Sequence, residues 1–563
     1  MNSAPAFAMG LDFGSTSVRA VVVDCRDGRE AGSGVWSYRS GEAGVLTDPR
    51  RPHLARQNPL DYLEGLRHVV PAALAAAAAS RRDFRPEAVI GIGVDATSST
   101  PIPVDAQCRP LAADPHFAGD LDAQAWMWKD HTAIDEAEAI TALARERRPR
   151  YLAQCGGACS PEWFFSKIWH CQRVAPAVFA AAHAWLEFAD FIPAALAGVQ
   201  DSRAVRAGIC AAGHKAMYND AWGGYPDAEF LAALSPEMAA LRERLPRQAV
   251  PADQVAGRLT ASWAAALGLP AGLPIAVGGI DAHLGAVGAG VAPGRMVAII
   301  GTSACDILVA PPGAAPPEIP GVCGIVPGSV LPDCLGIEAG QCAVGDIMHW
   351  FVTEICRGEA ALHGRLSAAA AALRPGQSGL LALDWHNGNR SILADARLTG
   401  LLVGMTLHTS QADIYRALIE ATAFGARRIL DQLESHGVGV EDVVACGGIA
   451  EKNPLFMQIY ADVLGRPMRL SASTQTCALG AAIMGAVAAG TAAGGYASVA
   501  QGQEAACAFQ ERVYRPDPAA AAVYQRLYAL YLDLHDSFGR PRTTFDHAGV
   551  MKGLLEIRRQ AEA

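Results

Sequence analysis

The sequence predicts an α/β protein made of two related lobes. Residues 7–24, "FAMGLDFGSTSVRAVVVD", place two apolar runs on either side of a Gly/Ser/Thr turn, which is typical of a strand hairpin. Residues 295–310, "RMVAIIGTSACDILVA", repeat that pattern in the second half of the chain. Residues 441–467 then give a strand, a glycine turn and a helix. Since the same hairpin opens both halves, we expect domains at 1–290 and 291–490 with a cleft between them, followed by a helical extension at 491–563.

Length, charge and cysteine usage limit the kind of protein this is. The chain has 563 residues, a formal net charge of −10 and 51% hydrophobic residues, which indicate a globular protein without a broad basic surface for nucleic acid or anionic membranes. We expect small-molecule partners, with no nucleic acid and no membrane. The N-terminus lacks the features of a signal peptide, and the 14 cysteines include no CxxC pair. Free thiols and a cytoplasmic location are therefore expected.

Other segments give elements that frame these hairpins. Residues 88–105 read as a looser copy of the hairpin, again with two apolar runs around a hydroxyl-rich tip. Thr132 and Asp135 suggest a capping box at the start of a helix. Asn453 is suited to cap the helix after residue 453, because Pro454 fits its first turn. The spaced Tyr and Leu residues of 520–538 predict an amphipathic helix that packs on the rest of the protein.

The turns of the two hairpins are candidate phosphate sites. Glycine and hydroxyl residues at a tight turn allow backbone N–H groups to converge on phosphate oxygens. A single turn of this kind more often just closes a hairpin, but its duplication favours phosphate binding. Asp12, at the end of the strand before the first turn, is placed to bind Mg²⁺. The Gly447–Gly448 turn lets a flat ring approach the backbone, or is a plain connector.

Asp281 stands alone in the apolar, glycine-rich run 276–290, "AVGGIDAHLGAVGAG". Burying an unpaired charge is costly, so this carboxylate has either a neutralising partner or a chemical task. It also suits the N-terminus of the helix that follows. "LDFGS" superficially matches the DFG of protein kinases, but the HRD, VAIK-like and Walker A motifs are absent from the sequence. Any ATP is therefore held in another way.

Ten ordered motifs resemble the FGGY carbohydrate kinases, and within that family the bacterial L-ribulokinases, over roughly residues 8–490. They are "GLDFGSTSVRA", "GVDATSSTPIPVD", "WKDHTAIDEAE", "SPEWFFSKIWH", "AGHK", "IGTSACDILVA", "GIEAGQ", "EATAFGARRI", "GGIAEKNPLFMQIYADVLGRP" and "CALGAAI". This resemblance implies two RNase H-like lobes of the actin/Hsp70/sugar-kinase type, with ATP and sugar meeting in the cleft. It implies Mg²⁺-dependent phosphorylation of L-ribulose at O5 by ATP, a step of L-arabinose catabolism.

The resemblance also assigns roles to individual residues. Asp281 matches the general base, and Asp12 the aspartate associated with the metal. His283 and His131 are tempting acid/base candidates, but orienting or structural roles suit them better. The ATP and phosphate positions are Gly14, Ser15, Thr16, Gly301, Thr302, Ser303, Gly447, Gly448 and Asn453; the sugar positions are Ser98, Trp128, Lys215, Asp281 and Glu338.

One departure leaves the substrate open. Family members often carry glycine where this chain has Ser98, which either narrows the sugar pocket or adds a hydroxyl contact. D-ribulose, ribitol or another pentose therefore remains an alternative. A nucleotide switch of the actin or Hsp70 kind without a sugar, and a catalytically inactive sugar-binding regulator, are more remote alternatives because Asp12, Asp281 and both turns are present. A homodimer is an open option.

Overall fold

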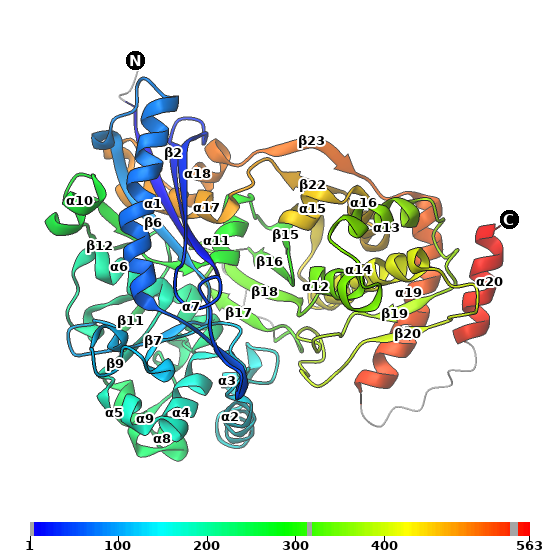
Figure 1. Cartoon of the computed structure of the whole chain (residues 1–563), viewed down its shortest axis with the longest axis horizontal. Coiled ribbons are helices and arrows are strands. Elements are labelled where there is room, and N and C mark those ends of the chain that lie inside the picture. Colours follow the sequence, from blue (N-terminus) through cyan, green and yellow to red (C-terminus); the bar gives the residue numbers. More distant parts are fainter. Residues whose placement is uncertain (1–4, 312–317, 541–549, 563) are drawn as a thin grey trace.

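The computed structural model describes residues 5–311, 318–540 and 550–562, and it shows two α/β lobes side by side (Figure 1). The first lobe is built on a sheet of order β12-β13-β6-β1-β2-β3. Its central strand β1 is antiparallel to β2 and parallel to β6, while short β14 also pairs with β6. The strands are β1 Phe7–Phe13, β2 Ser17–Asp24, β3 Glu30–Ser37, β6 Val89–Ala96, β12 Val255–Arg258, β13 Pro274–Ala276 and β14 Gly279–Ile280.

The second lobe repeats this arrangement in a sheet of order β17-β18-β16-β15-β21-β22-β23. Here β15 is antiparallel to β16 and parallel to β21, as β1 is to β2 and β6 in the first lobe. The duplicated hairpin and the two-lobe α/β fold are thus confirmed. The strands are β15 Gly294–Ile300, β16 Ala304–Ala310, β17 Gly324–Pro327, β18 Leu335–Gln341, β21 Val440–Cys446, β22 Met468–Ser471 and β23 Phe509–Tyr514.

The prediction of a third hairpin at 88–105 is wrong. Its first run forms β6, which lies parallel to β1, and its second run forms β7 (Pro101–Val104), which pairs with β9 (Ala184–Glu187) outside the main sheet. β6 is almost entirely buried, and a continuous apolar run is typical of a parallel strand covered on both faces. The hydroxyl-rich segment between β6 and β7 is therefore a loop at the sheet edge.

Helices cover both sheets and set the core. In the first lobe α1 (Pro59–Ser80) packs on β2 and β3. In the second lobe α14 (Gln411–Ser435) packs on α16 (Pro454–Leu464), and α19 (Pro518–Gly539) packs on α16 in turn. Asn453 caps α16 as predicted, and α19 buries its Tyr and Leu stripe. The segment after residue 490 also supplies β23 and helices α18 (Val499–Ala506) and α20 (Val550–Glu562).

The predicted capping box is wrong. Helix α2 (Ile134–Arg147) starts after Ala133 with no side-chain cap, because the Thr132 hydroxyl donates instead to Asp130 at 2.5 Å. The buried Asp130 carboxylate also accepts the Thr132 and Ala55 backbone N–H groups. The Thr132 hydroxyl therefore bonds to this buried carboxylate rather than to the exposed backbone N–H groups at the start of the helix. No helix in the described part of the chain combines the length and apolar character needed to cross a membrane.

Helix α17 (Thr476–Ala489) joins the two lobes. Although it follows β22 of the second sheet, it lies against β1 and β6 of the first sheet and against α11 (Asp281–Gly288). Glycines allow the backbones to approach: a Cβ on Gly93 of β6 would stand 1.7 Å from the Ala481 carbonyl oxygen. A Cβ on Gly480 would stand 1.8 Å from the Leu284 carbonyl oxygen. Strand β6, α17 and α11 are therefore packed backbone to backbone.

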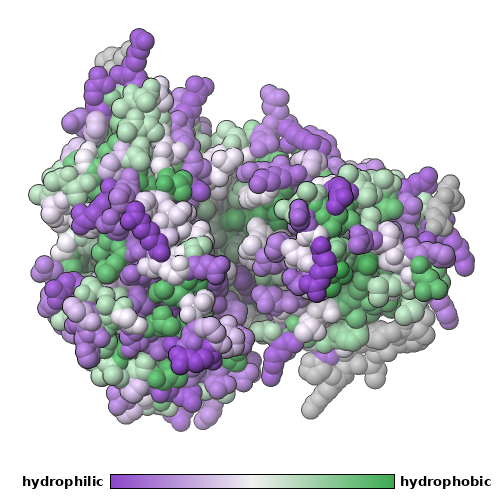
Figure 2. All heavy atoms as spheres, in the orientation of Figure 1, coloured by the Kyte–Doolittle hydropathy of each residue, from purple (hydrophilic) through white to green (hydrophobic). Residues whose placement is uncertain are grey.

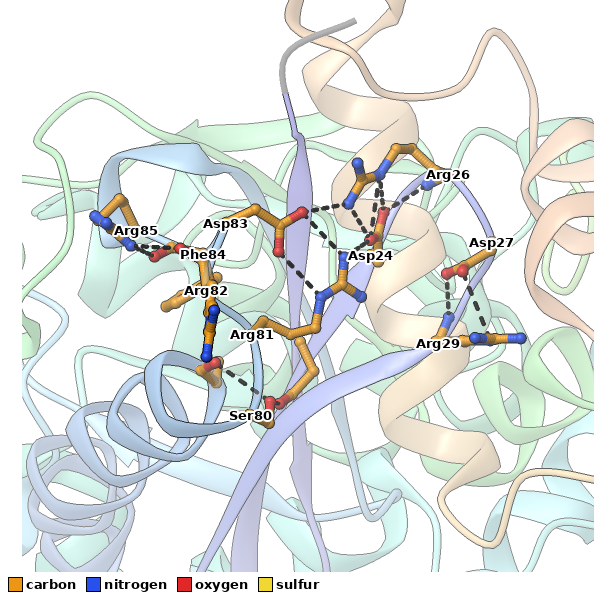
Figure 3. Close-up of polar contacts among 12 residues, drawn as sticks. Asp24, Arg26, Asp27, Arg29, Ser80, Arg81, Arg82, Asp83, Phe84 and Arg85 are labelled. Atoms are coloured by element: carbon orange, nitrogen blue, oxygen red, sulfur yellow. Dashed lines mark hydrogen bonds and ion pairs between the residues drawn. The ribbon is translucent and has the colours of Figure 1, made fainter. Parts of the chain in front are cut away.

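An ion cluster ties the end of β2 to the end of α1 (Figure 3). The buried Asp24 carboxylate accepts hydrogen bonds from Arg26 at 2.6 Å and from Arg81 at 2.9 Å. Asp83 accepts from both of these arginines on the other side, at 2.9 and 3.1 Å. Although burial opposes ionisation, the bonds from Arg26 and Arg81 hold the pKa of Asp24 below its ordinary 3.8.

We expect Asp24→Asn to lower the free energy of unfolding by about 1–3 kcal/mol at pH 7, because two guanidinium groups lose their shared carboxylate. Since the folded-state pKa of Asp24 is lowered, its contribution is present above the ordinary pKa and disappears as pH falls through the folded value. Denaturant unfolding at several pH values measures this. Asp27→Asn, which removes an exposed carboxylate 3.6 Å from Arg29, is the matched control and is expected to change little. Equal losses in both variants would contradict the prediction.

Candidate active site

Three aspartates meet where adjacent strands of the first sheet end. Asp12 of β1 lies opposite Asp95 of β6 in the parallel register. Asp281 follows β14 directly, and β14 pairs with the end of β6, so that Ile280 lies opposite Ala96. The carboxyl ends of parallel strands point to one edge of a sheet, which is where ligands usually bind in such folds. The three carboxylates therefore form one acidic group at the edge that faces the second lobe.

Burial raises the pKa of all three aspartates. It raises that of Asp12 even though Arg19 lies 3.3 Å away. The pKa of Asp95 is well above its ordinary value because of burial and the nearby Asp12 and Asp281, and neither of its oxygens has a hydrogen-bond partner among the described residues. Burial and Asp12 raise the pKa of Asp281 to about 7, although its Oδ1 accepts the Ala282 N–H at 2.7 Å. Asp281 can thus take up or release a proton near neutral pH.

Hydrogen bonds from neighbouring elements hold the two Gly/Ser/Thr turns in place, and the side of each turn away from these bonds is open. In the first turn, the Ser15 hydroxyl accepts from Trp128 Nε1 at 3.0 Å and the Ser15 carbonyl accepts from Gln57 at 2.8 Å. In the second, the carbonyls of Gly301 and Thr302 accept from the start of α12 (Gly345–Trp350) and the residue before it. A Cβ on Gly301 would meet no atom closer than 3.9 Å. A Cβ on Gly14 would meet only the Ser17 carbonyl oxygen, at 3.5 Å, so both turns leave room for a ligand.

The segment 447–453 lies beside the second turn. Gly447 has φ of +101° and leads into α15 (Gly448–Lys452), and a Cβ on Gly448 would find open space. The Asn453 side-chain oxygen accepts from Phe456 N and from the Ser367 hydroxyl, both at 3.1 Å. Asn453 is thus a helix cap in this structure, and only its amide nitrogen is left for a ligand.

Lys215 and Glu338 form an ion pair that joins the lobes. Lys215 is the last residue of α7 (Ile209–Lys215) in the first lobe, whereas Glu338 lies on β18 of the second. The ammonium donates to both carboxylate oxygens, at 2.7 and 2.8 Å. Burial opposes both charges, yet each partner stabilises the other: the pKa of Lys215 is raised, and Lys215 holds that of Glu338 well below its usual range. These are not the ordinary surface charges that their residue types would suggest.

The loop that carries Ser98 is held by two buried charges. Glu187 accepts from the Ser99 hydroxyl at 2.6 Å and from Thr100 N at 3.0 Å. Lys167 donates to the Ser99 carbonyl at 2.8 Å. The Ser98 hydroxyl, in contrast, is buried and has no hydrogen-bond partner in the described part of the chain. The loop is therefore fixed in place, and the Thr97 and Thr100 hydroxyls beside Ser98 also lack a hydrogen-bond partner in the described residues.

The space-filling view shows a recess between the two lobes (Figure 2). The strand ends with the three aspartates, both turns and the Lys215–Glu338 pair all belong to elements at this junction. Such an arrangement suits the transfer of a charged group: open glycine turns for phosphate oxygens, carboxylates for a metal ion and a proton, and paired charges for a polar acceptor.

Comparison with known families decides the relationship. The N-terminal domain model of the FGGY family of carbohydrate kinases matches residues 7–288, and the C-terminal domain model matches residues 296–489. The chain belongs to this family. It is therefore a sugar kinase, an enzyme that uses ATP, and the resemblance stated from its motifs is confirmed.

Individual relatives cover nearly the whole chain. A ribulokinase of Shouchella clausii is 42% identical across 99% of this chain and 98% of its own length, and a ribulokinase of Mycolicibacterium smegmatis is 41% identical with the same coverage. A solved xylulose kinase of Rhodospirillum rubrum has a TM-score of 0.74 at 25% identity, covering 95% of this chain and 100% of its own. A Brucella ovis sugar kinase has a TM-score of 0.78 at 22% identity, with 94% and 99% covered, and shows the shared fold.

The sequence reasoning missed Asp95 as a site residue. Its signal was present, because Gly93-Val94-Asp95 repeats the spacing of Gly10-Leu11-Asp12 in the neighbouring strand. The supporting residues Gln57, Lys167 and Glu187 were also missed. Gln57 and Glu187 lie in none of the quoted motifs, and Lys167 lies in "SPEWFFSKIWH", but each reaches the site from a distant part of the chain, so its contact could not be predicted from the sequence.

Proposed function

We propose that this kinase transfers the γ-phosphoryl group of ATP to O5 of L-ribulose, giving L-ribulose 5-phosphate and ADP, as a cytoplasmic step of L-arabinose use. The observation that carries this proposal is the convergence of Asp281 with Asp12 and Asp95 at the lobe junction, beside the Lys215–Glu338 pair. The ribulokinases that match over almost the full length support the choice of sugar.

Asp281 acts as the general base. It takes the proton of the C5 hydroxyl while that oxygen forms a bond to the γ-phosphorus, and the bond from this phosphorus to the β–γ bridging oxygen breaks to release ADP. A carboxylate with a pKa of about 7 suits this task at neutral pH. Backbone N–H groups and hydroxyls of the turns at residues 14–16 and 301–303 hold the phosphates, and Gly447, Gly448 and Asn453 lie on the adenosine side.

A Mg²⁺ ion fits the acidic group. Asp95 has two buried oxygens without a hydrogen-bond partner in the described residues, and Asp12 faces it across the register. Carboxylate oxygens are the ligands this ion prefers, and it usually reaches them directly or through water. Asp12, with Asp95, would hold the ion, which supplies positive charge to the phosphoryl group. Arg19 keeps Asp12 oriented from the other side.

The pentose is held by groups on both lobes. Lys215 and Glu338 form hydrogen bonds to its hydroxyl and carbonyl oxygens. Trp128 packs against the sugar beside the first turn, and the unpaired hydroxyl of Ser98 is available for a hydrogen bond. That hydroxyl is the specific observation that keeps D-ribulose, ribitol or another pentose as a second candidate, because these compounds present their hydroxyl groups to the pocket in different orientations.

A coupled assay of ADP release across L-ribulose, D-ribulose, L-xylulose, D-xylulose and ribitol tests the proposal. We expect the highest kcat/KM with L-ribulose, together with dependence on added Mg²⁺. A preference for another pentose would replace the substrate but keep the reaction. ATP hydrolysis that no pentose stimulates would contradict the proposed function.

A further inference from the structure

A buried histidine, His283, lies against the sugar-side ion pair. It sits on the first turn of α11, two residues after Asp281, and its side chain is fully buried. Its Nε2 is 3.5 Å from Glu338 Oε2. Neither ring nitrogen has a hydrogen-bond partner among the described residues, and the Glu338 carboxylate is the charged group in contact with this imidazole.

His214 closes the other side of the same carboxylate. The Ser329 hydroxyl donates its proton to the Val326 carbonyl at 3.0 Å, so it accepts from His214 Nε2 at 3.0 Å. Burial lowers the pKa of His214 well below its ordinary value, so the ring is neutral and Nδ1 carries a lone pair. This Nδ1 lies 3.5 Å from Glu338 Oε2 and cannot donate to it. His214 therefore limits the space of the carboxylate without donating a hydrogen bond to it.

The ring of His283 stacks obliquely on that of His214, with centroids 4.5 Å apart. Burial lowers the pKa of His283 to about 4, so it too is neutral at physiological pH. A neutral imidazole that faces a carboxylate places its single N–H toward it. His283 Nε2 thus lies 3.5 Å from Glu338 Oε2 on one side, in contact but without a direct hydrogen bond, while Lys215 donates to both oxygens from another.

We propose that His283 is a positioning residue for sugar recognition: it sets the orientation of the Glu338 carboxylate, and through it Lys215, from the same helix that carries Asp281. This inference rests on the proposed function, because Glu338 and Lys215 are its sugar contacts. Its consequence is that one rigid helix turn fixes both the base and the carboxylate that holds the acceptor sugar.

The same three groups are of types that bind metals, since ligand atoms of His214, His283 and Glu338 lie within 4.8 Å of one another. The Lys215 ammonium, however, already bonds both oxygens of the carboxylate. A divalent ion would have to displace this cation from a buried pair, which is unfavourable. The cluster is therefore assigned to orientation.

The test measures KM and kcat of His283→Leu and His283→Gln in the wild-type and Glu338→Gln backgrounds. We expect His283→Leu to raise the KM for the pentose about tenfold and to weaken discrimination between ketopentoses, with the KM for ATP nearly unchanged. His283→Gln, whose amide can donate to the carboxylate, should restore part of this loss. In the Glu338→Gln background the effect of His283→Leu should largely vanish, because both changes act on one interaction.

His535→Leu is the matched control, since His535 is equally buried but lies on α19 of the second lobe. Thermal melting checks folding, and if His283→Leu does not fold, His283→Gln in the two backgrounds carries the comparison. An unchanged pentose KM, or the same loss in both backgrounds, would overturn the inference. A wild-type enzyme that phosphorylates no pentose would instead contradict the proposed function.

Discussion

Replacing Asp281 by Asn is expected to lower kcat by about 10²–10⁴-fold while the KM for the sugar changes little. The amide keeps the shape of the side chain but cannot accept the proton of the attacking hydroxyl. The variant should fold well, because the carboxylate it removes is buried and has a raised pKa. A folded-state pKa above the ordinary value means that the ionised group costs stability above pH 7, so the Asn variant should be at least as stable there.

The pH profile gives a second readout of the same residue. Because the pKa of Asp281 is about 7, kcat/KM of the wild type should fall as pH decreases through 7, when the base becomes protonated. Asp306→Asn is a matched control, since burial also raises the pKa of Asp306 to about 7, in the second lobe. It should leave kcat and the profile unchanged. Near-normal turnover of Asp281→Asn would exclude this residue as the base.

Local features of the fold could be predicted from the sequence. The strands of each hairpin are neighbours in the chain, so their alternation and glycine turns define them without further information. The cap of α16 was equally local, because Asn453 and Pro454 lie next to the helix they start. The parallel partner of β1 was not predictable in this way. The local pattern of residues 88–105 is that of a hairpin. The pairing of β6 with β1, some eighty residues earlier in the chain, cannot be inferred from that pattern.

In the site, too, residues with a local sequence signal could be predicted, and residues that depend on long-range contacts could not. Asp281 was conspicuous because a lone carboxylate in an apolar run demands an explanation. Lys215 and Glu338 were identified only through resemblance, since they are 123 positions apart and each looks like a surface charge by itself. The structure brings these residues to one junction, while their roles with ATP and sugar remain predictions. Asp95 was overlooked because its significance depends on register with Asp12.

Replacing Gly480 by Ala is expected to disturb both stability and catalysis. The added Cβ would lie 1.8 Å from the Leu284 carbonyl oxygen and 3.0 Å or less from further backbone atoms of α11, so no flexible side chain can move aside. Overpacking of this kind costs about 1–3 kcal/mol, partly offset by about 1 kcal/mol of helix propensity gained over Gly. Helix α11 must shift away from α17, and it carries Asp281. A displacement of about 1 Å at a reacting group lowers the rate by about 10²-fold.

Melting temperature and kcat of Gly480→Ala measure the two effects, and Gly364→Ala provides the comparison. Gly364 is also helical, in α13 (Ala361–Ala371), but it is exposed and a Cβ there would meet no atom within 4 Å. This control should gain up to about 1 kcal/mol of stability from reduced chain entropy and keep its kcat. If Gly480→Ala behaved like Gly364→Ala, the close contact between α17 and α11 would not be what holds Asp281 in place. A fall in kcat together with a rise in the pentose KM would show that the contact acts through α11, because this helix carries both Asp281 and His283.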